Sequence, residues 1–253
     1  MTKPSPLLAA LGGAVLISFS AIFFRASEAD PITGGFFRMG LALPILFVLA
    51  WRLRSQDRRS RSDRVLAVTA GVLLGLDGIA WHAAIGHVGT GLATLTANSQ
   101  VMVVPLVTWM ALGERPSNRA LWAMPVVMVG LALLTGLGRS DSFGTRPVLG
   151  ISLAVLAAAF YSGFLILFRR SGRSLPPPAA GLLDVTLGGA LTIGAIGVVT
   201  GDLDPTPAPA TLAWLAALAI CAQVAGWLAI SYALPRLSAA ATSFAILLQP
   251  SLT

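Results

Sequence analysis

Apolar stretches follow one another along almost the whole chain, separated by short polar or charged segments. Each is close to the length of about twenty residues that a helix needs to cross a bilayer. The stretches are apolar on all sides, unlike the one-sided pattern of a surface helix. We therefore predict nine membrane-spanning segments, the last one incomplete: 6–24, 31–51, 65–86, 90–112, 119–137, 147–168, 178–200, 209–234 and 237 to the end of the chain.

Polar residues within these segments recur at a fixed spacing. The pairs related by an offset of 146 residues are Arg38 with Asp184, Asp77 with Gln223, and Trp81 with Trp227. In the fourth and ninth segments the offset becomes 149, which relates Gln100 to Gln249. Polar groups in lipid are costly and tend to line a pathway, so a repeat that includes them favours a transporter.

The spacing also predicts the architecture. Five segments per copy is an odd number, so the second copy enters the membrane in the opposite sense to the first. We expect an all-α integral membrane protein made of two inverted five-helix repeats, with a first repeat at 1–138 and a second, incomplete repeat at 147–253.

Composition and charge placement exclude other classes of protein. The chain is 56% hydrophobic and 11% charged, whereas soluble domains carry about 25% charged residues. The net charge of +7 could suggest nucleic acid binding, but with the N-terminus in the cytoplasm thirteen basic residues face that side and three face the other. This is the positive-inside bias of membrane proteins. We expect a multi-pass protein with a cytoplasmic N-terminus and no nucleic acid partner.

Depth along each segment predicts which polar residues can meet. With a rise of about 1.5 Å per residue, Arg38 and Asp77 both lie roughly 10–12 Å below the outer face, so we expect them to contact each other. That pair could be purely structural or could serve a substrate, and both readings stay open. Asp184 and Gln223 fall roughly 9 Å above the inner face. Asp184 has no evident cationic partner in the sequence, which favours a functional role.

The remaining candidates lie near the middle or the ends of the segments. Gln100 and Gln249 fall near the midplane, and Trp81 and Trp227 suit interfacial belts better than a cavity. The full set of residues that we predict along a substrate pathway is Arg38, Asp77, Trp81, Asn98, Gln100, Tyr161, Asp184, Gln223, Trp227 and Gln249.

Signals for catalysis or for a cofactor are missing from the sequence. The only cysteine, Cys221, lies in an apolar segment, and the only histidines, His82 and His87, have no clustered ligands beside them. A metal site is therefore not expected. The chain has no Gly-x-Ser-x-Gly elbow and no nucleotide-binding P-loop, so we expect neither an enzyme nor a cofactor.

Several motifs resemble a known family. The run Gly91-Leu92-Ala93-Thr94-Leu95-Thr96-Ala97-Asn98-Ser99-Gln100, the helix end Leu112-Gly113-Glu114-Arg115-Pro116, Asp77 with Trp81-His82, and Leu247-Leu248-Gln249-Pro250 are similar to the EamA-type transporters of the drug/metabolite transporter superfamily. The resemblance implies ten helices in two inverted repeats, a central cavity, and export of amino acids or other small metabolites from bacteria. The chain stops inside the ninth segment, so we expect a fragment or a truncated protein without the tenth helix.

The function that follows is secondary transport across the bacterial inner membrane by alternating access. A small-molecule substrate and the lipid bilayer are the expected partners, and a homodimer is left open. Two alternatives are an intramembrane enzyme and a non-transporting membrane scaffold or receptor. Flux into liposomes separates the three.

Overall fold

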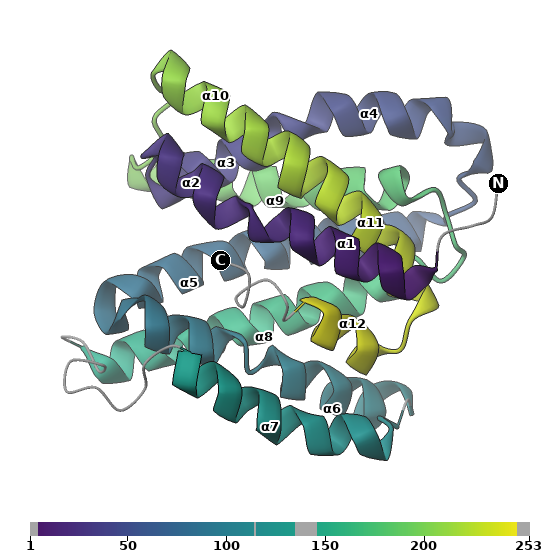
Figure 1. Ribbon diagram of the computed structural model, residues 1–253. Coiled ribbons are helices and arrows are strands. Elements are labelled where there is room, and N and C mark those ends of the chain that lie inside the picture. Colours follow the sequence, from purple (N-terminus) through teal and green to yellow (C-terminus); the bar gives the residue numbers. More distant parts are fainter. Residues whose placement is uncertain (1–4, 114, 135–145, 247–253) are drawn as a thin grey trace.

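All regular elements in the part of the chain that the structure describes are helices (Figure 1). The structure is a computed structural model, and the described residues are 5–113, 115–134 and 146–246. The all-α prediction is confirmed over these residues.

The first half of the chain forms the helices α1 (Pro6–Ser18), α2 (Ser20–Ser27), α3 (Pro31–Gly40), α4 (Ala42–Arg52), η1 (Arg54–Gln56), α5 (Arg61–Ala97), α6 (Gln100–Leu112) and α7 (Asn118–Leu134). The second half forms α8 (Pro147–Ser171), α9 (Pro178–Thr200), α10 (Pro209–Leu218), η2 (Ala219–Gly226), α11 (Trp227–Ala233), η3 (Leu234–Arg236) and α12 (Ala239–Ile246).

Six stretches of described helix are long and apolar enough to cross a membrane: Pro6–Ser27, Pro31–Arg52, Arg61–Gly89, Pro147–Ser171, Pro178–Thr200 and Pro209–Arg236. They correspond to six of the nine predicted segments. The other three fall on α6, α7 and α12, of which α6 and α7 have 13 and 17 residues. Part of the ninth predicted segment, including Gln249, lies outside the described residues.

Proline and glycine set several helix boundaries. A proline occupies the first turn of α1, α3, α8, α9 and α10, where its missing N–H costs no hydrogen bond and its fixed φ suits a helix. Gly89 bends α5, because its φ of 75° lies in a region that glycine adopts without strain. The segment predicted at 90–112 is divided at residues 98 and 99, between the end of α5 and the start of α6.

Helices from the two halves of the chain alternate in the bundle. The helix α5 lies against α8 and α9, while α1 lies against α11 and η2 (Figure 1). Glycines make these approaches close. A Cβ on Gly71 of α5 would overlap the backbone of Val185 on α9, and a Cβ on Gly13 of α1 would reach the carbonyl oxygen of Gly226. Small residues at such crossings let helix backbones pack closely where lipid provides no hydrophobic drive.

Candidate functional site

A row of three hydrogen-bonded polar side chains connects the two halves of the sequence inside the bundle. The Nε of Arg38 on α3 donates to Oε1 of Gln223 at 3.1 Å, and Nε2 of Gln223 donates to Oγ1 of Thr186 on α9 at 3.1 Å. Gln223 and Thr186 are each 0% exposed. A buried donor without a partner would cost about 1–3 kcal/mol, so these three side chains fix one another.

The helix that carries Gln223 has an unusual hydrogen-bonding pattern around this residue. Residues Ala219–Gly226 form the π-helix η2 between the α-helical segments α10 and α11. Short π segments are rare and frequently mark functional sites. Gln223 lies near the middle of the 28-residue span Pro209–Arg236. The structure does not bring Gln223 into contact with Asp184; its partner is Arg38, near the C-terminal end of α3.

Asp77 on α5 and Tyr161 on α8 lie near the same guanidinium. Both are within electrostatic range of Arg38. The predicted direct contact is not formed, since no ion pair within 4.0 Å joins Arg38 to a carboxylate in the described part of the chain. Among the described residues, no acceptor is hydrogen-bonded to the two Nη atoms of Arg38, and no donor is hydrogen-bonded to the carboxylate of Asp77. Arg38 and Asp77 are both half-buried.

The start of α6 adds further polar groups to this cluster. Gln100 is 7% exposed, and its side-chain amide faces the hydroxyl of Tyr161. The Oε1 atom of Gln100 is buried and has no partner among the described residues. Asn98 is half-buried in the turn before α6, where its carbonyl oxygen accepts from the N–H of Val101 at 3.1 Å.

Asp184 does not belong to this cluster. Its Oδ2 accepts from Nη1 of Arg59 at 2.7 Å, and Arg59 also pairs with Asp57 at 3.0 Å. Arg64 pairs with Asp57 at 3.4 Å, which makes an alternating row of charges. The prediction that Asp184 lacks a cation is wrong. Arg59 follows the connection from α4 and comes just before α5, and the one sequence signal for it is the crowd of arginines at 52–64.

The protonation of this row is tuned by its own contacts. Burial alone would raise the pKa of Asp57, but hydrogen bonds from Arg59 and its charge outweigh burial and hold the pKa below the ordinary value. Burial opposes the charge of Arg59, but its hydrogen bond to Asp57 and the charge of Asp184 raise the pKa of Arg59 above its ordinary value. The contacts between Asp57 and Arg59 therefore favour the charged form of each.

The two tryptophans related by the repeat have different surroundings. Trp227 is 3% exposed and packs edge-on against Phe164, with ring centroids 5.2 Å apart at 71°. The predicted interfacial belt position of Trp227 is therefore wrong, because its ring belongs to the core of the bundle. Trp81 is half-buried and meets the ring of His82 at 4.8 Å.

The residue pattern and the helical bundle both agree with the comparison with known families. The model of the EamA-like transporter family matches residues 4–136, which is more than half of the chain. The chain belongs to this family. The EamA assignment makes it a multi-pass membrane protein of the drug/metabolite transporter type, and the sequence resemblance is confirmed.

The fold is also found among solved structures. One solved structure, named only "Crystal structure of protein", superposes on this chain with a TM-score of 0.79 at 18% sequence identity. The superposition covers 99% of this chain and 89% of that chain. At this identity the likeness shows the fold alone. No curated protein matches this EamA family member.

Proposed function

We propose that this chain is a secondary transporter that exports small metabolites, such as amino acids or related compounds, across the bacterial inner membrane by alternating access. The family supports transport. The observation that carries the substrate class is a pair of charged groups in the cluster, the Nη atoms of Arg38 and the carboxylate of Asp77, which have no hydrogen-bond or ion-pair partner among the described residues.

These two groups suit a substrate that carries both charges. A guanidinium binds a carboxylate through two parallel hydrogen bonds when both Nη atoms are available. Asp77 and the unpartnered Oε1 of Gln100 are acceptors that match an ammonium group. A zwitterion would pair its carboxylate with Arg38 and its ammonium group with Asp77 at the same time. Neither charged group of the protein would then be left unpaired in a water-poor site.

The contacts between helices support two inverted repeats. In the repeat, α5 corresponds to α11 and α8 corresponds to α1. The contact of α5 with α8 therefore has its counterpart in the contact of α11 with α1. The contact of α6 with α8 corresponds to that of α12 with α1, while the pairs of α4 with α9 and α6 with α12 correspond to themselves. A pseudo-two-fold relation of this kind underlies rocking of one repeat against the other around a central site.

The orientation follows from the arginines and can be measured. In a background where Cys221 is replaced by serine, a cysteine at Ser60 or at Asp204 occupies an exposed loop position. We expect Asp204→Cys to react with an impermeant thiol reagent in intact cells and Ser60→Cys to be shielded until the membrane is opened. The reverse labelling contradicts a cytoplasmic N-terminus.

The transport proposal is tested by flux in proteoliposomes loaded with a mixture of labelled amino acids and related metabolites. Relative to the unaltered protein, we expect Arg38→Gln to lower flux by about tenfold or more, because a hydrogen bond to a charged group contributes about 1.5–3 kcal/mol. The matched control is Arg25→Gln, which removes an exposed arginine. Absence of flux with correctly inserted protein, or conversion of the solutes, supports a scaffold or an enzyme instead.

A further inference from the structure

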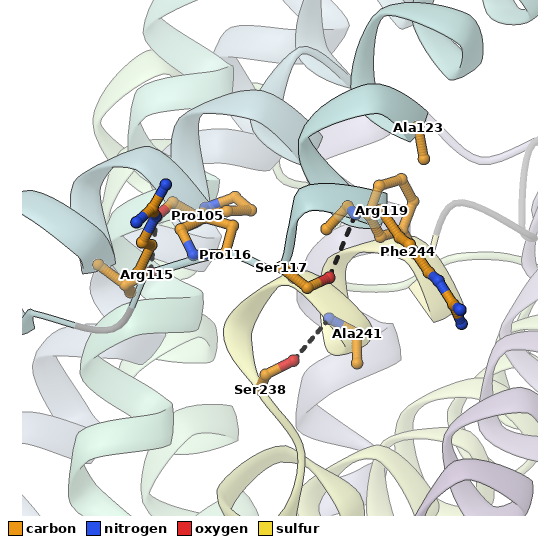
Figure 2. A pocket seen from close by; sticks show the side chains of 12 residues that line it. Pro105, Arg115, Pro116, Ser117, Arg119, Ala123, Ser238, Ala241 and Phe244 are labelled. Atoms are coloured by element: carbon orange, nitrogen blue, oxygen red, sulfur yellow. Dashed lines mark hydrogen bonds between the residues drawn. The ribbon is translucent and has the colours of Figure 1, made fainter.

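A cavity lies apart from the polar cluster, between α6, α7 and α12 (Figure 2). Its volume is about 500 Å³, and residues of both halves of the chain line it. Two arginines contribute to its wall, Arg115 from the connection between α6 and α7 and Arg119 from the first turn of α7. Neither forms an ion pair within 4.0 Å in the described part of the chain.

Among the described residues, the lining holds two guanidiniums that can donate hydrogen bonds to an anion and no carboxylate. Its other polar side chains are that of Thr108, whose Oγ1 donates to the carbonyl oxygens of Val104 and Pro105, and those of Ser117 and Ser238. The Oγ of Ser117 accepts from the N–H of Ala120 at 3.2 Å, which leaves its own O–H for a ligand. Figure 2 shows Arg115 and Arg119 at two ends of this lining, with Phe244 beside Arg119. The cavity therefore suits an anionic ligand larger than one small ion.

The surroundings suit an amphiphile rather than a soluble anion. The connection between α6 and α7, which carries Arg115, lies at the end of the bundle where α4 ends and the arginine-rich loop 52–64 begins (Figure 1). Trp109 and Trp122 are 39% and 78% exposed on α6 and α7, and Arg115 lies over the Trp109 ring at 5.7 Å. Met110 is 87% exposed beside them. Tryptophan prefers the headgroup level of a bilayer, and apolar exposure next to it suits acyl chains.

We propose that this cavity binds the phosphate-bearing headgroup of an anionic phospholipid, with the acyl chains along the apolar faces of α6 and α7. Arg115 and Arg119 hold the phosphate oxygens through charge-assisted hydrogen bonds. Basic pockets between membrane helices on the cytoplasmic side are suited to such headgroups. Because α12 belongs to the second half of the chain, a bound lipid would join that half to α6 and α7.

The test is a titration of the full chain in neutral detergent micelles with fluorescent phosphatidylglycerol, and with fluorescent phosphatidylcholine in parallel. We expect preferential binding of phosphatidylglycerol. Arg115→Gln combined with Arg119→Gln should weaken that binding by about 25-fold, because each basic residue near a membrane surface contributes about 1 kcal/mol, or about fivefold. Ala123→Leu, which narrows the cavity and keeps both charges, should weaken binding of the same lipid without changing the net charge.

The matched control is Arg170→Gln combined with Arg173→Gln, which removes two exposed arginines that do not line the cavity. Equal losses in the control and in the Arg115/Arg119 variant overturn the site, because surface charge alone then accounts for binding. Displacement of the lipid by inorganic phosphate at the same concentration overturns the lipid assignment in favour of a soluble anion.

Discussion

The guanidinium of Arg38 donates to the side-chain oxygen of Gln223 at 3.1 Å, although 185 residues separate them in the chain. One belongs to the first half of the molecule and the other to the second. This bond therefore reports on how the halves meet, and it also holds one face of Arg38 while its Nη atoms stay available.

Replacement of Gln223 separates these two roles. Gln223→Leu removes the acceptor and leaves a buried donor on Arg38, so we expect a loss of about 1–3 kcal/mol of stability together with reduced flux. Gln223→Glu supplies a charged acceptor and should keep stability while it lowers flux, because Arg38 is then held by the protein. Thermal unfolding in detergent and liposome flux measure the two effects, and equal flux in both variants and the unaltered chain contradicts the role.

Asp77 should behave as an unpaired acid. Breaking a buried ion pair typically costs about 3–5 kcal/mol, whereas Asp77 has no direct partner to leave behind among the described residues. We therefore expect Asp77→Asn to lose most of the flux with little change in thermal stability. Exchange of Arg38 and Asp77 in a double variant should not restore flux. A large loss of stability in Asp77→Asn, with recovery in the exchange, indicates a direct pair instead.

The ion pair of Arg59 with Asp184 should contribute measurably to stability. The side chains of Arg59 and Asp184 are 2% and 20% exposed, so the cost of breaking the pair should lie near or below the low end of about 3–5 kcal/mol. Arg59→Gln should cost more than Asp184→Asn, because Arg59 also holds Asp57. A double-mutant cycle on unfolding free energies measures the coupling, and additive effects contradict it.

The lowered pKa of Asp57 gives a pH dependence with a definite sign. The unfolded chain binds a proton more readily than the folded one, so the stabilisation is complete above the ordinary carboxyl pKa of about 4 and is lost as pH falls through the lower, folded value. Unfolding temperatures between about pH 3 and 7 should fall less steeply at the acidic end for Asp57→Asn. Asp30→Asn, which removes a carboxylate at an exposed position, is the matched control.

Gly71 should tolerate no side chain. A Cβ there would meet the backbone carbonyl of Val185 on α9, so we expect Gly71→Ala to destabilise the bundle by about 1–3 kcal/mol. Gly86 on the same helix has no heavy atom within 4 Å of the position that a Cβ would take, so Gly86→Ala should be neutral or stabilising by up to about 1 kcal/mol. Similar unfolding temperatures for the two variants contradict close packing of α5 on α9.

Sequence reasoning is most accurate for features that depend on composition. Spans such as 178–200 can be recognised because continuous apolar length is itself the physical requirement for crossing a bilayer. The family resemblance, carried by motifs around Gly91–Gln100 and Gly113–Pro116, agrees with the family match over residues 4–136. The bend at Gly89 escapes such reasoning, since a glycine in an apolar run does not reveal its φ.

Pairings between side chains are predicted less well, for a geometric reason. Depth arithmetic treats each residue as a point on a straight helix, but the long side chain of Arg38 extends to Gln223, and Gln223 lies on a π-helix. The partner of Asp184 cannot be found in this way because Arg59 lies outside the apolar segments, and a loop residue has no depth that a helical rise can assign.

The π-helix η2 also sets the direction in which the side chains of the following helix α11 point. Each added or removed residue turns a helix by about 100°, because an α-helix has 3.6 residues per turn. Deleting one residue within 219–226 would convert the wide turn to an ordinary one and swing Gln223 relative to Trp227. Gln223 could then no longer face Arg38 while Trp227 faces Phe164. The wide turn therefore sets the rotation of α11 relative to α10.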